Sequence, residues 1–395
     1  MINQEPFVSN QVGEARVFTS ATCGSDLFEI AAEAPDGFGL TNSARLTVPK
    51  DFDPEHRYSF GLASLPGFPT PTPPPAPPVC QAYPLGQPKE HALTGLAAAP
   101  DGTLWAATWG LGAARYDPAA DRWIWLTAED GLLSSYIHAI TIEPDGRMWF
   151  ATNQGVSVLD GEQWTHYTAS DGLVSSYVHR VALDEKGTAW FATDEGVSRL
   201  ELDTGQWQSY TTDDGLPDPY VKTIAIAANG KVWVSALGEL ATLAADTNTD
   251  HWQVSETLGN MPFVDRILAT PDGGLWFAGM DGLAVRGSKT FGSQDFDGSN
   301  TQGAFQGSAR SLALAPDGSL WIGNKNDRPR LYHLIPAQDG SGPDRWQIFN
   351  ARDGLPSTPA LESIDDGVVD RAAVSNQTIW LATPMYVVRC IFPEQ

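Results

Sequence analysis

Residues 131–155 read GLLSSYIHAITIEPDGRMWFATNQG, and residues 172–196 read GLVSSYVHRVALDEKGTAWFATDEG. Both stretches start with Gly-Leu, continue with an apolar run and a turn, and end on a tryptophan followed by Phe-Ala-Thr. A tryptophan with similar neighbours recurs along the chain, at Trp105, Trp149, Trp190, Trp233, Trp276, Trp321 and Trp380. The intervals are 44, 41, 43, 43, 45 and 59 residues, so the last unit carries an insertion. Such a period is typical of a repeat architecture.

Each unit divides into four short strands. An apolar segment such as 178–183 is followed by a tight turn, by the tryptophan strand, and by a third apolar strand. The fourth strand carries an aromatic pair such as Trp207 and Tyr210, and ends in the sequence DGL in four units. The spacing of three and four residues between apolar positions that marks helices is missing. The repeat therefore predicts an all-β fold, a seven-bladed β-propeller.

The last unit ends after three strands, and the missing fourth strand is present upstream. Residues 79–83 have the pattern of residues 206–210, so we expect them to pair with residues 386–392 and to close the ring. Closure of this kind removes two exposed sheet edges. Cys80 and Cys390 then lie on neighbouring strands, in a register that we expect to be diagonal. They are candidates for a disulfide; the alternative is two buried thiols.

The front of the chain does not match the repeat. Residues 1–65 contain none of the 14 tryptophans, and short runs at 15–22, 27–32, 44–48 and 58–63 predict a few β-strands. Residues 66–78, PGFPTPTPPPAPP, have the composition of an extended, semi-rigid linker. The predicted organisation is a short β-rich segment (1–65), a Pro/Thr-rich linker (66–78) and the propeller (79–395).

Composition excludes several classes of partner. The formal net charge of −24 argues against nucleic acid and against anionic membrane surfaces. No apolar run is long enough for membrane insertion. The first residues lack the basic and apolar regions of a signal peptide, so we expect any export signal to lie outside this chain. Three cysteines are too few for a disulfide scaffold and wrongly spaced for zinc, and we expect no metal or other cofactor.

The DGL turn, the apolar strand and the pattern D-x-x-G-x-x-W followed by apolar, small and Thr residues resemble the two-component regulator propeller repeat. The clearest copies are residues 131–155 and 172–196, and the resemblance extends over 79–395. It implies an extracytoplasmic sensor region of a bacterial signalling protein, periplasmic, cell-surface or secreted, that recognises a ligand, often a carbohydrate. The chain departs from the full-length pattern because it has no membrane span, kinase or DNA-binding domain.

A polar position recurs 11 residues before each blade tryptophan, near the expected mouth of a central channel. It is occupied by Thr94, His138, His179, Lys222, Asp265 and Arg310, and we assign Asp370 to it in the last blade, where the turn is taken as one residue shorter. Three interpretations remain open: a water-lined channel with compensating charges, a ligand pocket, and metal binding by His138 and His179. Metal binding lacks a third ligand in the neighbouring blades.

Trp109 is a second candidate, because it falls in a turn on the same face, where other blades have Asn153 or Asp194. An exposed indole can stack on a sugar or anchor a protein contact; the alternative is an ordinary surface aromatic.

No catalytic motif such as GxSxG, HExxH or a phosphate-binding loop is present. We therefore predict a non-enzymatic ligand-binding or sensory module that recognises a glycan or another small molecule on the face of the inter-blade loops. Two alternatives stay open. One is a propeller lyase or hydrolase similar to the streptogramin lyases, with His138 or His179 as acid–base and Asp265 orienting it. The other is a scaffold for a protein partner.

Overall fold

The computed structural model describes residues 27–32, 42–47, 78–85, 93–117, 119–243, 251–255, 264–280, 282–286, 308–325, 330–336, 345–350, 355, 366–369, 378–383 and 386–392. The chain divides into two compact units, residues 1–76 and 77–395. The division falls inside the stretch predicted to be a linker.

In the first unit, β1 (Leu27–Ala32) pairs antiparallel with β2 (Asn42–Thr47). These strands correspond to two of the four expected runs, the second starting two residues early. The runs expected at 15–22 and 58–63 lie outside the described residues, as does the linker up to residue 77.

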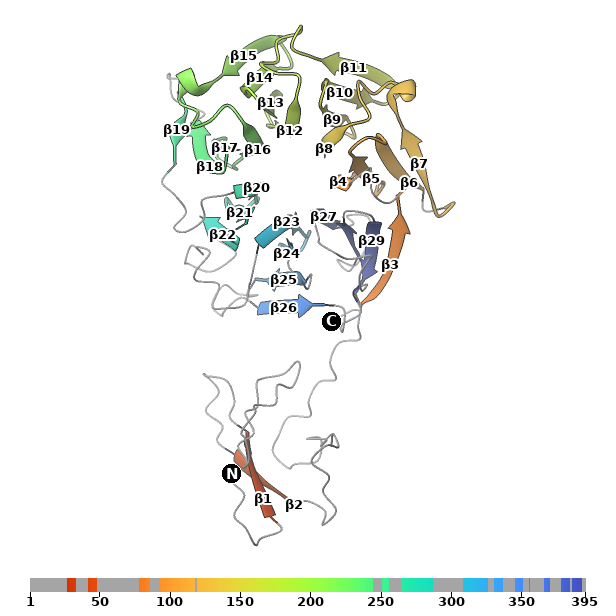
Figure 1. The fold of residues 1–395 in the computed structure, drawn as a ribbon, viewed down its shortest axis with the longest axis vertical. Coiled ribbons are helices and arrows are strands. Elements are labelled where there is room, and N and C mark those ends of the chain that lie inside the picture. The colour runs from red at the N-terminus through yellow and green to blue at the C-terminus, as the bar shows by residue number, and fades with distance from the viewer. Residues whose placement is uncertain are drawn as a thin grey trace. The chain divides into compact units, whose positions relative to one another are not determined.

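The second unit is the predicted seven-bladed propeller. Its strands form seven antiparallel sheets; from the centre outward, six follow the order of the chain, and the seventh ends on a strand from the front of the propeller (Figure 1). Blades 1 to 3 are β4 (Leu93–Ala98), β5 (Leu104–Thr108), β6 (Ala113–Asp117) and β7 (Arg122–Leu126); β8 (Ile137–Ile142), β9 (Met148–Thr152), β10 (Gly155–Asp160) and β11 (Gln163–Tyr167); and β12 (Val178–Leu183), β13 (Thr188–Thr193), β14 (Gly196–Glu201) and β15 (Gln206–Tyr210). Blades 4 and 5 are β16 (Val221–Ile226), β17 (Val232–Ala236), β18 (Glu239–Leu243) and β19 (Gln253–Val254); and β20 (Val264–Ala269), β21 (Leu275–Gly279) and β22 (Gly282–Arg286). Blades 6 and 7 are β23 (Ser308–Leu314), β24 (Leu320–Lys325), β25 (Leu331–Ile335) and β26 (Arg345–Phe349); and β27 (Asp366–Val369), β28 (Thr378–Ala382), β29 (Tyr386–Ile391) and β3 (Val79–Pro84).

The first strand of every blade lies at the centre. In Figure 1 these strands surround the middle of the ring, and each contacts the first strand of the next blade, including β27 with β4. The seventh blade combines strands from both ends of the propeller, because β3 pairs with β29 along its whole length (Figure 1). The ring closure expected from residues 79–83 is thus confirmed.

The cysteine register differs from the expectation. Cys80 and Cys390 are directly opposite, not diagonal, and a disulfide joins them with a Cα–Cα distance of 4.1 Å. The same positions in blade 3 hold Trp207 and Leu200, which are also direct partners. The repeat alignment therefore contained the correct register, and the diagonal assignment was wrong.

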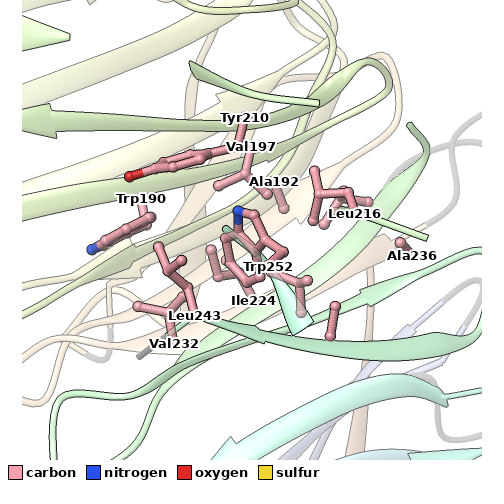
Figure 2. Packing of buried hydrophobic residues seen from close by; sticks show 13 residues of the cluster. Trp190, Ala192, Val197, Tyr210, Leu216, Ile224, Val232, Ala236, Leu243 and Trp252 are labelled. Atoms are coloured by element: carbon pink, nitrogen blue, oxygen red, sulfur yellow. The ribbon is translucent and has the colours of Figure 1, made fainter. Parts of the chain in front are cut away.

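Packing between blades forms the core. All seven blade tryptophans are buried, with at most 6% of their surface exposed. In the cluster between blades 3 and 4, Trp190 of blade 3 packs with Ile224 and Trp252 of blade 4 (Figure 2). Burying one aromatic side chain of 150–250 Å² contributes about 4–6 kcal/mol as an upper bound. The tryptophans are thus core residues that hold neighbouring blades together.

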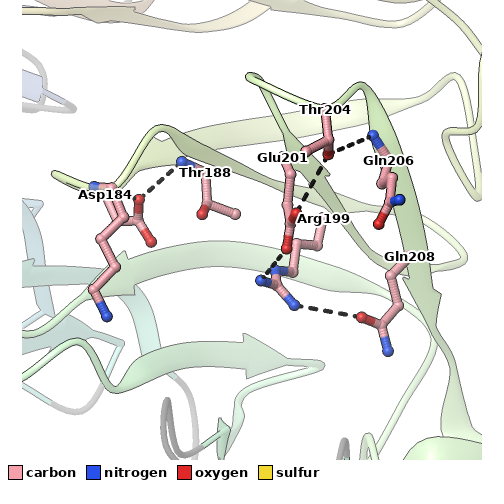
Figure 3. A network of polar contacts seen from close by, with 8 residues as sticks. Asp184, Thr188, Arg199, Glu201, Thr204, Gln206 and Gln208 are labelled. Carbon is pink, nitrogen blue, oxygen red and sulfur yellow. Dashed lines mark hydrogen bonds and ion pairs between the residues drawn. The ribbon is translucent and has the colours of Figure 1, made fainter.

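Polar side chains cover the outer part of a blade. In blade 3, Arg199 lies over the Trp190 ring at 5.5 Å, donates to Glu201 Oε1 at 2.8 Å and reaches Gln208 at 3.5 Å (Figure 3). Thr204 adds a hydrogen bond to the other oxygen of Glu201. This network lies on the third and fourth strands, away from the centre, and its role is to cover the indole.

The DGL turns connect the blades and have a common structure. Asp171 accepts from the backbone N–H and the hydroxyl of Thr168 at 2.8 Å each, and Asp130 and Asp214 accept from Thr127 and Thr211 in the same way. The leucines of the four DGL sequences are buried: Leu132, Leu173, Leu216 and Leu355. The aspartate therefore holds the turn through its hydrogen bonds, and the leucine anchors the turn to the core.

We expect removal of the disulfide to weaken the ring. A Cys80→Ala/Cys390→Ala variant should lose about 2–5 kcal/mol of unfolding free energy, because the cross-link closes a loop of 310 residues in the unfolded chain. Urea denaturation of oxidised and reduced protein measures the effect. Reductant should shift the wild-type midpoint and leave that of the double variant unchanged; equal midpoints for wild type and variant would contradict the expected contribution.

The DGL glycine has a steric requirement. At Gly172 φ is +131°, and a Cβ would lie 2.4 Å from Cγ of Trp207. Gly172→Ala should therefore cost about 2–4 kcal/mol of unfolding free energy in urea denaturation, from overpacking and backbone strain together. Gly146 is the matched control, since its φ is +95° but a Cβ there meets nothing within 4 Å. A similar cost for both alanine variants would show that the indole contact is unimportant.

Candidate functional site

One face of the propeller carries both the inter-blade connections and the turns between the second and third strands of each blade; we call it the connection face. Backbone hydrogen bonds hold the two kinds of segment together. The N–H of Asn153 donates to the carbonyl of Tyr136 at 3.2 Å, and Asp194 and Leu237 donate equivalently to Tyr177 and Tyr220. A turn residue and a tyrosine of the preceding connection therefore lie side by side in blades 2, 3 and 4.

Every described residue of the polar column lies at a β-bulge of its innermost strand. At each of these positions the pairing of the first and second strands shifts by one residue, so the column residue has no direct partner on the second strand. The six residues are Thr94, His138, His179, Lys222, Asp265 and Arg310. A bulge bends the strand and changes the direction of its side chains. The bulges were not predicted, because a one-residue register shift leaves no mark in the apolar pattern.

The strand pairing of the last blade does not support the assignment of Asp370 to this column. The residue opposite the blade tryptophan follows the column residue by three positions in blades 1 to 6, as Thr141 opposite Trp149 follows His138. In blade 7 the residue opposite Trp380 is Val368, so Asp370 comes after the pair instead of before it. The turn that follows β27 is longer than in the other blades, not one residue shorter. Asp370 itself lies outside the described residues.

Aromatic rings from four consecutive blades form a continuous arc on the connection face. Its members, which we call the aromatic arc, are Trp109, Tyr136, His138, Tyr177, His179 and Tyr220. Ring centroids lie 5.1 Å apart for Trp109 and Tyr136, 4.7 Å for Trp109 and His138, 4.9 Å for His138 and His179, and 4.9 Å for His179 and Tyr220. Tyr177 contacts both histidines, at 4.8 and 5.3 Å.

The three tyrosines were missed in the sequence. Each precedes a column residue by two positions, in SSYIH, SSYVH and DPYVK, and this recurrence is the signal that identifies them. Tyr136 and Tyr220 are 44% and 36% exposed, whereas Trp109 is half-buried against Tyr136 and His138 and not the free surface indole considered above. The tyrosines therefore present the arc to solvent.

The two histidines have different partners. His179 Nε2 donates to Asp194 Oδ1 at 2.6 Å, whereas His138 Nε2 is buried and has no hydrogen-bond partner among the residues that the structure describes. Burial, with a smaller effect of His179, lowers the pKa of His138 to about 4. Burial also lowers the pKa of His179, and the hydrogen bond to Asp194 opposes this shift. His138 is thus neutral at pH 7, with a polar atom that lacks a partner.

Three charged column residues form a cluster next to the arc. Lys222 Nζ lies 2.5 Å from Asp265 Oδ1, and Arg310 Nη1 lies 3.2 Å from Asp265 Oδ2. Asp265 is the most enclosed of the three, with 15% of its side chain exposed against 42% for Lys222 and 29% for Arg310. We call these residues the charged cluster. Their charges compensate in part, as one of the sequence interpretations expected.

Thr94 has a different role. Its hydroxyl donates to the carbonyl of Ile137 at 2.6 Å, which ties blade 1 to blade 2. Further apolar side chains on the connection face are exposed in the turns of blades 4 and 5: Leu237 at 60% and Met280 at 59%. In the described part of the chain, no group of three or more His, Cys, Asp or Glu side chains is placed to hold a metal ion.

Residues 131–154 match the two component regulator propeller family. The chain carries a two-component regulator propeller repeat. This confirms the resemblance noted in the repeat that begins at the first DGL turn. No curated protein matches the chain in sequence. No helix in the described ranges is both long and apolar enough to span a membrane.

Solved structures share the fold at low sequence identity. The extracellular domain of the putative hybrid two component system BT3049 from B. thetaiotaomicron is 18% identical, with a TM-score of 0.60 over 80% of this chain and 42% of that one. The extracellular domain of the putative one component system BT4673 from the same organism is 18% identical, with a TM-score of 0.58 over 79% and 41%. This chain therefore spans about two fifths of the length of those two domains. A catalytically inactive virginiamycin B lyase from Staphylococcus aureus, with quinupristin, is 13% identical, with a TM-score of 0.58 over 79% and 98%.

The depressed pKa of His138 predicts an acid-sensitive site. Because the folded pKa is about 4 and the unfolded value about 6.5, the unfolded chain takes up this proton first as the pH falls. His138 should therefore lower the unfolding free energy progressively between pH 6.5 and 4, by up to about 3 kcal/mol. Urea denaturation at pH 7, 5 and 4 should show a smaller loss for His138→Gln than for wild type. His166→Gln, at an exposed position on β11, should lose as much unfolding free energy on acidification as wild type. The same loss in His138→Gln as in wild type would contradict the prediction.

Proposed function

We propose that the propeller is the ligand-binding part of an extracytoplasmic sensor or receptor, and that it binds a glycan or another ring-bearing small molecule on the connection face. The observation that carries the proposal is the aromatic arc. Four blades contribute contacting rings to it, and Tyr136 and Tyr220 are its most exposed members. Rings of this kind combine apolar area with a polar group and lose little entropy on binding.

The arc also provides polar groups. His138 Nε2 is a buried atom without a partner in the described part of the chain, and a ligand hydroxyl would satisfy it. Tyr136 and Tyr220, which are both exposed, add their hydroxyls to the arc. A largely apolar surface with a few polar groups is the usual composition of a small-molecule site.

Two further observations support an extracytoplasmic sensor. The disulfide between Cys80 and Cys390 is a feature of proteins that fold in oxidising compartments. The similar structures BT3049 and BT4673 are extracellular domains of two and one component systems, although the shared fold does not by itself determine function.

A protein partner and an enzymatic activity are the alternative outcomes. Leu237 and Met280 extend the apolar surface beyond the arc, and a contact with a protein would cover them. An acid–base role for His179 is less favoured, because its Nε2 is already bonded to Asp194. Turnover of a bound ligand would reveal catalysis.

The test is a thermal-shift screen of the full chain against a glycan and small-molecule library. A ligand at about a hundred times its Kd adds about 2.7 kcal/mol, or a few degrees in melting temperature. Trp109→Ala should weaken a hit at least about tenfold, since the indole supports Tyr136 and His138. Trp125→Ala is the matched control, a half-buried indole on the outermost strand of the same blade.

Equal affinity of both tryptophan variants for the hit would place the ligand elsewhere and contradict the proposal. A library without hits, together with a captured protein whose binding Leu237→Ser abolishes, would favour the scaffold.

A further inference from the structure

The charged cluster adjoins the aromatic arc at blade 4. Lys222 follows Tyr220 by two residues, and its positive charge contributes to the lowered pKa of His179. Asp265 contributes to the raised pKa of Tyr220. The Tyr220 ring also contacts His179, with centroids 4.9 Å apart, and β16, which carries Lys222, contacts both β12 and β20, so rings and charges belong to one surface. Its first part is aromatic, from blades 1 to 4, and its second part is ionic, from blades 4 to 6.

The charges within the charged cluster do not balance. Lys222 and Arg310 carry two positive charges and Asp265 one negative charge, which leaves one positive charge in the cluster. The imbalance stands out in a chain whose net charge is −24. Arg310 Nε is in addition buried without a hydrogen-bond partner in the part of the chain that the structure describes. The cluster thus has both a surplus positive charge and an N–H donor without a partner.

We propose that the ligand is an acid whose ring covers Tyr220 and whose carboxylate binds between Lys222 and Arg310. The inference rests on the proposed function, because it identifies the ligand of the same site. Asp265 acts as the internal counter-ion that holds both cations in position while the site is empty. One added carboxylate makes the cluster neutral, and its two oxygens match the remaining donors of the guanidinium and the ammonium.

The chemistry excludes a neutral glycan as the best ligand. Without a negative charge on the ligand the cluster keeps its surplus positive charge, and covering that charge would cost desolvation energy. Two sources share the required chemistry: a sugar acid, whose ring stacks on tyrosine through its C–H groups, and an aromatic acid, which stacks through its π-face.

The test uses the full chain with ¹⁵N in the arginine and tryptophan side chains, followed by NMR at pH 7. Two pairs of probes are titrated: galacturonate against galactose, and benzoate against benzyl alcohol. The Arg310 Nε–H signal is assigned by its loss in Arg310→Lys. The acid of at least one pair should shift this signal, and its neutral partner should not. Tighter binding of galacturonate identifies a sugar acid, and tighter binding of benzoate an aromatic acid.

Two variants with opposite expected effects on the affinity for the acid distinguish a loss of ligand recognition from a damaged fold. Lys222→Met should weaken the binding acid about tenfold, since it removes one charge-assisted hydrogen bond. Asp265→Asn should strengthen it, because the carboxylate that competes for both cations is gone. Lys186→Met is the matched control, an exposed lysine in the turn between the first and second strands of blade 3, on the opposite face. It should bind like wild type.

The proposal is wrong if neither acid shifts the Arg310 signal, if acids and neutral partners shift it equally, or if Asp265→Asn weakens the acid as Lys222→Met does. The indole N–H of Trp109 reports separately on the proposed function. If a probe shifts the Trp109 signal and leaves the Arg310 signal unchanged, ligand binding at the aromatic arc is supported. Only the proposal of a carboxylate site at Lys222 and Arg310 is then wrong.

Discussion

The pairing of β3 with β29 is the constraint on which the rest of the structure depends. A blade of four strands cannot bury its tryptophan alone; it needs the next blade on each side, and a row of blades becomes a closed body only when the last one meets the first. The upstream strand of residues 79–84 completes the last blade, so the chain joins its own ends. The disulfide between Cys80 and Cys390 fixes this junction covalently.

Closure positions the functional surface as well. The innermost strands contact one another around the ring, and those of blades 1 to 6 bulge at the column position, from Thr94 to Arg310. The bulge interrupts regular pairing, and polar side chains occur there, whereas the paired residue before each bulge is apolar, from Leu93 to Ala309. Stability and variation therefore fall to different residues. The tryptophans between the blades stabilise the propeller, and the bulged residues near the centre can differ from blade to blade.

The type of side chain at this surface changes from aromatic to charged around the ring. Blades 1 to 4 contribute rings that contact one another in sequence, from Trp109 to Tyr220, and blades 4 to 6 contribute alternating charges. Two atoms at this surface, His138 Nε2 and Arg310 Nε, are buried without partners within the described ranges. Buried polar atoms normally have partners, and each exception asks for a reason. A ligand that supplies an acceptor or a hydroxyl offers one reason for both.

The sequence by itself determined the number of blades, the burial of the repeated tryptophans and the strand that closes the ring. These features depend on local patterns that recur at a fixed period, so each copy supports the assignment of the others. The tertiary structure alone decided which side chains meet. The tyrosines and histidines of the arc lie about 40 residues apart in the chain, and only the ring brings them into contact. The bulges and the direct pairing of the cysteines became visible only in the strand pairing, because the spacing of the tryptophans does not determine which residues of two neighbouring strands are partners. The pairing of Val368 with Trp380 likewise shows that the turn length assumed for the last blade does not apply.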